Sequence, residues 1–170
     1  MMPGFVIHTA IGQEYYKKHR NIENYNDFIK GNILPDLTHN KSETHYGKSP
    51  AYTNLKKFLE NNKINTSLNQ GIFLHLIADY LFYNHYLDRI SKEILHNDYD
   101  LINKFLIEKY DVLLTDKVKK FVFFKEGIPE IVTLDLAIKV IEEVSNLDMF
   151  EVEKEVWNDN EKWRTYKNKV

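Results

Sequence analysis

Apolar side chains recur every three or four residues along most of this chain, and apolar and polar residues rarely alternate with a period of two. A spacing of three and four places the apolar residues on one face of an α-helix. Glycine and proline, which interrupt helices, number only six and four. The pattern predicts an all-α fold. No repeat, low-complexity tract or linker divides the sequence, so we expect residues 1–170 to form a single-domain multi-helix bundle.

The pattern also sets approximate limits for the helices. Thr66 or Ser67 begins the central helix, and Ser49 followed by Pro50 has the N-cap and first-turn residues of another. Asp148 resembles the first residue of a capping box at the start of the last helix. The expected helices cover about residues 12–20, 24–30, 50–61, 67–87, 91–108, 115–124, 133–145 and 148–167.

Turn-forming residues interrupt the helices between residues 31 and 48. Pro35 breaks helix geometry and biases Leu34 toward an extended conformation. The polar stretch 38–48 is expected to be an irregular loop. Loops held by a rigid scaffold often carry functional residues, so the histidines of this stretch are candidates for a site.

The central helix carries the most informative polar residues. From Gly71 to Leu87 it is apolar or aromatic on nearly all sides, which predicts that other helices enclose it. His75 and Asp79 lie four residues apart, so their side chains share one helix face and can bind one cation. A buried carboxylate costs several kcal/mol unless it is paired or coordinated. An isolated pair of this kind also fits a structural hydrogen bond.

Further candidate ligands lie elsewhere in the sequence. His8 is near the start, Asp36 follows the proline break, and His45 lies in the expected loop. His39 is an alternative to His45 as the loop ligand, whereas His19 on an amphipathic helix is expected to face solvent. Several independent ligand residues together favour a hydrolytic metal centre over an isolated hydrogen bond.

Composition narrows the function classes. The formal charge of -2 shows no basic excess, so we expect no stable nucleic-acid partner. The chain has no cysteine, so a metal site must use nitrogen and oxygen ligands, which suit zinc, manganese or iron. The start of the sequence has neither a basic region nor an apolar run long enough for a signal peptide or a membrane span. We therefore expect a cytoplasmic protein, and the abundance of asparagine, lysine and isoleucine suggests a bacterial source.

The spacing of the ligands resembles that of the zinc-dependent phospholipase C and P1-type nuclease family, whose members are all-helical and carry three zinc ions. In that family the central helix has a His-x-x-x-Asp pair followed by a histidine six residues after the aspartate, as in His75, Asp79 and His85. An aspartate and a histidine precede the pair, similar to Asp36 and His45. The resemblance covers about residues 8–100.

The resemblance implies three sets of ligands. One metal would be held by Asp36, His45, His75 and Asp79. Asp79 would bridge to a second metal, which His8 also binds. A third would be bound by His85, His96 and Asp100, which requires a break in the helix around residues 88–91. Secreted family members also use an N-terminal tryptophan as a ligand, whereas this chain begins with two methionines.

These observations predict a metal-dependent phosphoesterase that uses a metal-bridged water. The resemblance favours two or three zinc ions and assigns the catalytic roles to Asp36 and Asp79. A phospholipid head group, a nucleotide and a small phosphate ester all remain open as substrates, and the oligomeric state is open as well. The alternative is a non-catalytic helical protein with a structural metal or a metal-free network of histidine and aspartate hydrogen bonds.

Overall fold

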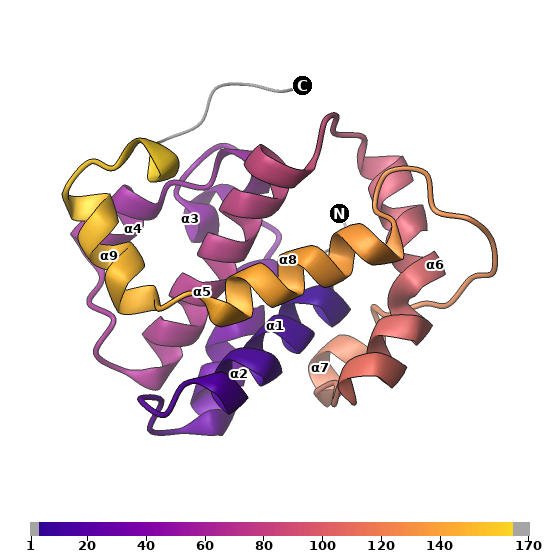
Figure 1. Ribbon diagram of the computed structural model, residues 1–170, viewed down its shortest axis with the longest axis horizontal. Helices are drawn as coiled ribbons and strands as arrows, with labels where there is room; N and C mark the ends of the chain where they lie inside the picture. Colours follow the sequence, from indigo (N-terminus) through magenta and orange to yellow (C-terminus); the bar gives the residue numbers. More distant parts are fainter. Residues whose placement is uncertain (1–3, 165–170) are drawn as a thin grey trace.

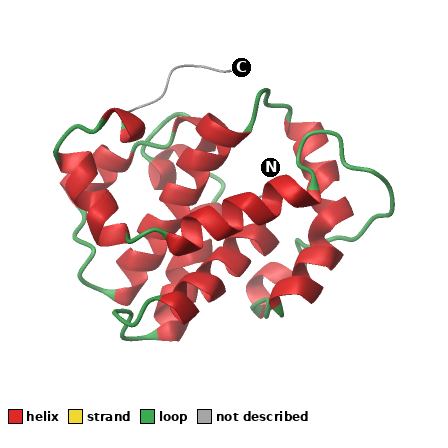
Figure 2. Cartoon of the chain, viewed as in Figure 1, coloured by secondary structure: helices red, strands yellow, loops and turns green. Residues whose placement is uncertain are grey.

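The computed structural model describes residues 4–164, and within them every regular element is helical (Figure 2). The comparison with the N-terminal ligand of the family concerns residues 1–3, which lie outside the described range. The α-helices are α1 (Phe5–Lys18), α2 (Tyr25–Ile33), α3 (Lys41–His45), α4 (Leu55–Asn61), α5 (Ser67–Leu81), α6 (Lys92–Tyr110), α7 (Asp116–Lys119), α8 (Leu134–Asn146) and α9 (Met149–Trp157). Short 3-10 turns are η1 (Leu34–Asp36), η2 (Pro50–Tyr52) and η4 (Glu161–Trp163), and η3 (Phe82–Tyr86) is a π-helical turn.

Two glycines bring the helices α2 and α5 into backbone contact. A Cβ atom on Gly31 would lie 2.0 Å from the Leu68 carbonyl oxygen, and one on Gly71 would lie 2.1 Å from the Phe28 carbonyl oxygen. Neither position has room for a side chain. The carbonyl of Asn32 on α2 therefore comes within reach of the α5 residue one turn beyond Gly71, which is His75.

Helix α1 packs against one helix distant in sequence and against the helix that follows it. Its two main neighbours are α8, which runs alongside it, and α2 (Figure 1). Ala10 and Ile11 of α1 are fully buried, as are Val140 and Ile141 of α8. The hydroxyl of Tyr15 accepts a hydrogen bond from the Met149 backbone N–H at 3.1 Å, which fixes the start of α9 against α1. The apolar residues of α1, α5 and α8 belong to one continuous core.

The helix α6 anchors the connection between α7 and α8. Asp98 is fully buried and accepts hydrogen bonds from three successive backbone N–H groups, those of Glu130, Ile131 and Val132, at 2.9, 2.6 and 2.8 Å. These bonds satisfy both carboxylate oxygens, and within residues 4–164 Asp98 has no ion-pair partner. They hold the end of the connection close to the middle of α6.

Several predicted helix boundaries are confirmed. Side chains of Thr66, Ser91, Thr133 and Asp148 accept backbone hydrogen bonds as N-caps of α5, α6, α8 and α9. The predicted break near residues 88–91 is present, since the chain between η3 and α6 is not helical.

Other predicted boundaries are wrong. The first helix begins at Phe5 rather than near residue 12, and the stretch 38–48 contains the short helix α3. The helix expected from Pro50 is a 3-10 turn followed by α4, for which Asn54 is the N-cap. The helices expected over 115–124 and 148–167 end at Lys119 and Trp157.

The conformation of Leu34 also differs from the prediction. Leu34 has helical angles (φ -56°, ψ -43°) instead of extended ones. Pro35 lies in the first turn of η1, where its missing N–H would have no intrahelical partner. The proline therefore tightens the chain into a turn, which brings Asp36 back toward α5.

Candidate metal centre

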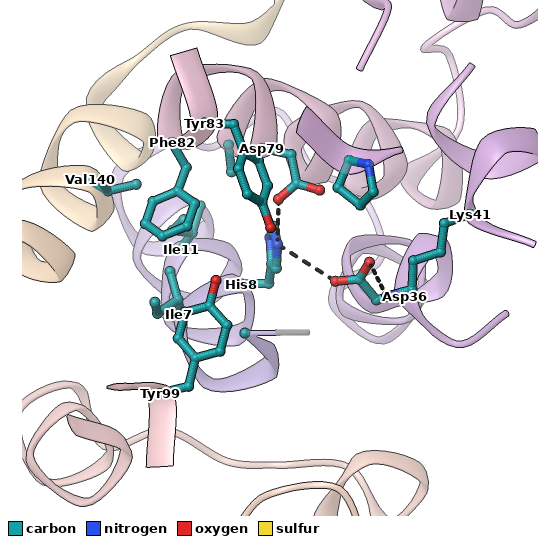
Figure 3. A pocket seen from close by; sticks show the side chains of 13 residues that line it. Ile7, His8, Ile11, Asp36, Lys41, Asp79, Phe82, Tyr83, Tyr99 and Val140 are labelled. Atoms are coloured by element: carbon teal, nitrogen blue, oxygen red, sulfur yellow. Dashed lines mark hydrogen bonds and ion pairs between the residues drawn. The ribbon is translucent and has the colours of Figure 1, made fainter. Parts of the chain in front are cut away.

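Four buried side chains point their donor atoms at one another. One nitrogen or carboxylate oxygen from each of Asp36, His45, His75 and Asp79 lies within 4.8 Å of the others. Asp36 comes from η1, His45 from the end of α3, and the other two from one face of α5. His8 on α1 approaches the same group, as Figure 3 shows.

The carboxylate of Asp79 joins two sets of nitrogen atoms. Its Oδ2 atom lies 2.9 Å from His45 Nε2 and 3.2 Å from His75 Nε2. Its Oδ1 atom lies 2.9 Å from His8 Nε2. Because the two oxygens face different imidazoles, Asp79 has the geometry of a bridging carboxylate. Asp36 lies farther out, with its oxygens 3.6 to 3.8 Å from the same three imidazole nitrogens.

Backbone carbonyls orient two of the imidazoles. His75 Nδ1 lies 2.6 Å from the Asn32 carbonyl oxygen, and His45 Nδ1 lies 3.0 Å from the Lys41 carbonyl oxygen. A carbonyl oxygen only accepts, so each Nδ1 carries the proton and, in the neutral ring, each Nε2 presents a lone pair. The two Nε2 atoms are 3.3 Å apart. Two facing lone pairs at this distance repel unless a positive charge lies between them, so the donor set fits a metal cation.

The charges in the centre favour a positive charge at the same place. Burial disfavours the charged form of His75, but the carboxylates of Asp36 and Asp79 outweigh it and raise the pKa of His75 to about 10. Burial would likewise raise the pKa of both carboxyls, but the neighbouring imidazoles, His75 above all, hold the pKa of each below its usual range. The centre therefore favours positive charge beside the carboxylates, either as a proton or as a metal cation.

His8 has a different environment from His75. Burial and the nearby His75 lower the pKa of His8, which favours the neutral ring. The two rings are stacked, with centroids 3.7 Å apart and an interplanar angle of 13°. The Nδ1 atom of His8 is buried and has no hydrogen-bond partner within residues 4–164. In the neutral ring the Nε2–H would donate to Asp79 Oδ1, and a cation shared with Asp79 would take the place of that proton.

Five of the eight predicted ligands are thus brought together, and the other three are not. His85 lies at the surface in η3, with its ring 5.9 Å from that of Tyr80. His96 lines a neighbouring cavity, and Asp100 lies 3.5 Å from Lys125 Nζ. Within the described part of the chain, His85, His96 and Asp100 do not form a cluster of donors. The π-helical turn and the non-helical stretch after it carry the chain away before α6 begins.

The structure also settles the positions of the remaining histidines. His39 is exposed, and His45 is the loop histidine within the centre. The prediction that His19 faces solvent is wrong. Its ring stacks on Tyr15 with centroids 3.9 Å apart, and its Nε2 atom lies 3.0 Å from the Ser145 carbonyl oxygen.

Sequence reasoning missed three side chains near the centre. Lys41 Nζ lies 3.2 Å from Asp36 Oδ1, and the lysine side chain is only 14% exposed. Tyr83 and Tyr99 line the pocket beside His8, and Figure 3 shows the Tyr83 hydroxyl directed toward that histidine. Burial raises the pKa of both tyrosines, so both hydroxyls stay protonated and can donate. The spacing of four residues from Asp79 to Tyr83 was the signal that these residues share a face.

The fold and the centre define a class, that of all-helical proteins with a buried histidine and aspartate site suited to a metal. The comparison with protein families gives the specific assignment. Residues 5–162 match the family model described as zinc dependent phospholipase C, so the chain belongs to this family. The resemblance predicted from the spacing of the ligands is thereby confirmed. Neither the curated proteins nor the solved structures gave a significant match.

Proposed function

We propose that this protein is a zinc-dependent hydrolase of phosphate esters. The observation that carries the proposal is the pair of imidazole Nε2 atoms, 3.3 Å apart, which their backbone partners orient toward the carboxylate of Asp79. Membership of the zinc-dependent phospholipase C family supports zinc over the manganese or iron that the same donors accept.

The donors divide into two sets. Asp36, His45, His75 and the Oδ2 atom of Asp79 would hold one cation, and His8 with the Oδ1 atom of Asp79 would help to hold a second. Zinc bound there would act as a Lewis acid toward a phosphoryl oxygen and make water a stronger acid. The bridging position of Asp79 would keep the two cations close together.

The protein's own groups would bind and orient the ester. Asp36 would orient the attacking water as a carboxylate, and Lys41, 3.2 Å from its Oδ1 atom, would help to keep it in that form. A cavity of about 750 Å³ adjoins these two residues, and Lys48 and Lys92 are also in its lining. Lysines around the cavity favour an anionic ester. The Tyr83 hydroxyl, which stays neutral, can donate a hydrogen bond to a phosphoryl oxygen.

Metal analysis combined with an activity assay tests the proposal. Purified protein should contain about two zinc ions per chain by inductively coupled plasma mass spectrometry, and it should hydrolyse bis(p-nitrophenyl) phosphate or p-nitrophenyl phosphate. His75→Ala and Asp79→Ala should lose zinc and activity while far-UV circular dichroism keeps its helical signal. His39→Ala is the matched control for zinc content, because His39 is exposed in the lining of the cavity but lies outside the donor set.

Two outcomes would overturn the proposal in different ways. Zinc retained at full occupancy without hydrolysis of any ester in a broad screen would identify a structural metal site. Protein that binds neither zinc nor manganese, and whose two centre variants behave like the wild type, would identify a metal-free network of hydrogen bonds.

A further inference from the structure

The connection that follows α7 exposes its largest apolar side chains. Between Lys117 and Lys125 the sequence has four lysines, three phenylalanines and no acidic residue. Phe121, Phe123 and Phe124 are 36%, 53% and 59% exposed, while Val118 is fully buried. Burial of apolar area alone would favour the opposite arrangement, because phenylalanine buries more area than valine. We name residues 117–125 the aromatic segment.

The backbone holds the aromatic segment in place. The Phe123 carbonyl accepts a hydrogen bond from the side-chain amide of Asn103 at 3.0 Å. The Lys125 backbone N–H donates to the Asp100 carbonyl at 2.9 Å, and the three bonds to Asp98 fix the chain a few residues further on. The phenylalanines therefore face outward from an anchored backbone, and their exposure is a property of the fold.

The aromatic segment is continuous with the cavity of the proposed site. The ring of Phe121 stacks on that of Phe5 with centroids 5.9 Å apart, and both rings line the cavity that Asp36 adjoins. Val118 packs with Phe5 and Ile33 beneath this rim. A binding partner that covers the aromatic segment would thus also approach the rim of the cavity.

The charge of the aromatic segment indicates which kind of partner binds it. Lys119 lies 3.4 Å from Asp116 and Lys125 lies 3.5 Å from Asp100, but both lysines are more than half exposed, so these pairs contribute little. Aromatic rings interleaved with lysines are typical of surfaces that lie in the interface of an anionic bilayer. In residues 4–164 no helix is long and apolar enough to cross a membrane.

We propose that the aromatic segment docks this protein onto the surface of bilayers that contain anionic lipids. The phenylalanines insert among the head groups, and the lysines bind lipid phosphates. Docking places the rim of the cavity at the bilayer. That a lipid of the bilayer is also the substrate rests on the proposed function, whereas the docking itself does not.

Vesicle sedimentation tests the docking. Full-length protein should sediment with vesicles of phosphatidylglycerol mixed with phosphatidylcholine, and only weakly with phosphatidylcholine alone. The double variant Phe123→Ser/Phe124→Ser should reduce partitioning by about tenfold or more. The double variant Lys119→Gln/Lys120→Gln should bind anionic vesicles several-fold less tightly, and salt near 1 M should remove the difference between the two lipid mixtures.

Matched controls lie on α9, at the opposite side of the molecule from α6 and α7 (Figure 1). Trp157 is an exposed aromatic residue and Lys154 an exposed lysine, so Trp157→Ser and Lys154→Gln change the same chemistry away from the segment. Both should leave partitioning unchanged. All variants should keep the wild-type zinc content and the wild-type activity on a water-soluble ester, which separates docking from the metal centre.

Other outcomes overturn the docking proposal or the proposed function separately. Equal partitioning of the Phe123→Ser/Phe124→Ser variant and the wild type would overturn the docking proposal. The docking proposal would also be overturned if the wild type did not bind vesicles but self-associated in analytical ultracentrifugation, and this variant did not self-associate. Vesicle binding by a protein that hydrolyses no ester would leave the docking intact and overturn the proposed function.

Discussion

The close approach of α2 and α5 makes Gly71→Ala a test of how the fold supports the metal centre. The new Cβ atom would lie 2.1 Å from the Phe28 carbonyl oxygen, and ordinary van der Waals contact begins at 3.4 Å. The helices would have to separate by about 1.3 Å, the difference between these distances. Both neighbouring groups are backbone, so no rotamer change relieves the clash.

The magnitude follows from two opposing effects. Overpacking of this kind costs about 3 kcal/mol, and the higher helix propensity of alanine returns about 1 kcal/mol. We expect a net loss of about 2 kcal/mol in the free energy of unfolding and a melting temperature lower by about 4 to 8 °C. The same separation would stretch the 2.6 Å contact between His75 Nδ1 and the Asn32 carbonyl, so zinc affinity should fall by about 10- to 100-fold.

Two measurements check this prediction. Urea unfolding with a chelator present gives the stability of the fold alone, and competition with a zinc-binding dye gives the affinity. Gly4→Ala is the control, because its Cβ atom would lie 3.5 Å from Tyr99 in ordinary contact. Wild-type stability in Gly71→Ala would refute the close helix contact. A destabilised variant with unchanged zinc affinity would refute the coupling between the contact and the centre.

Three further predictions concern other parts of the molecule. Burial raises the pKa of Tyr15 to about 12, above about 10 in the unfolded chain. Ionisation of Tyr15 should therefore lower the free energy of unfolding as pH rises from 10 to 12, by about 1.4 kcal/mol per pH unit. Urea unfolding of Tyr15→Phe across this range should show a shallower decline than the wild type, and an identical slope would contradict the prediction. Asp98→Asn replaces an acceptor of three backbone hydrogen bonds and should lower the free energy of unfolding by about 2 to 4 kcal/mol. Proteolysis between residues 120 and 133 should become faster, and unchanged cleavage would show that Asp98 does not anchor the connection. His85→Ala should keep the wild-type zinc content, and loss of one ion would place this residue in a third site after all.

Local sequence signals predicted the starts of four helices well, those of α5, α6, α8 and α9. Their N-caps are Thr66, Ser91, Thr133 and Asp148. A short polar side chain directly before an apolar run is favoured as an N-cap, because its oxygen accepts a hydrogen bond from a free backbone N–H of the first turn. Signals that depend on distant partners failed. The amphipathic pattern after Thr115 continues to Phe124, but hydrogen bonds with α6 hold the chain after α7 in a non-helical path.

The centre was predictable to the extent that its residues are close in sequence. The spacing of His75 and Asp79 places them on one face of a helix by geometry alone. The convergence of His8, Asp36 and His45 on this pair depends on tertiary structure, and only the family resemblance indicated it. The partners that orient the imidazoles are backbone carbonyls of Asn32 and Lys41, and no side-chain pattern reveals them.

The order of the elements along the chain has a consequence for biosynthesis. All five donors that converge in the centre lie within the first 79 residues, whereas α8, the cover of α1, begins at Leu134. A ribosome adds 5 to 20 residues per second, so the 55 residues from 79 to 134 take about 3 to 11 s. During this interval the donors have been made and the helix that covers α1 has not. The donors of the proposed metal site are therefore available to a cation before the core closes.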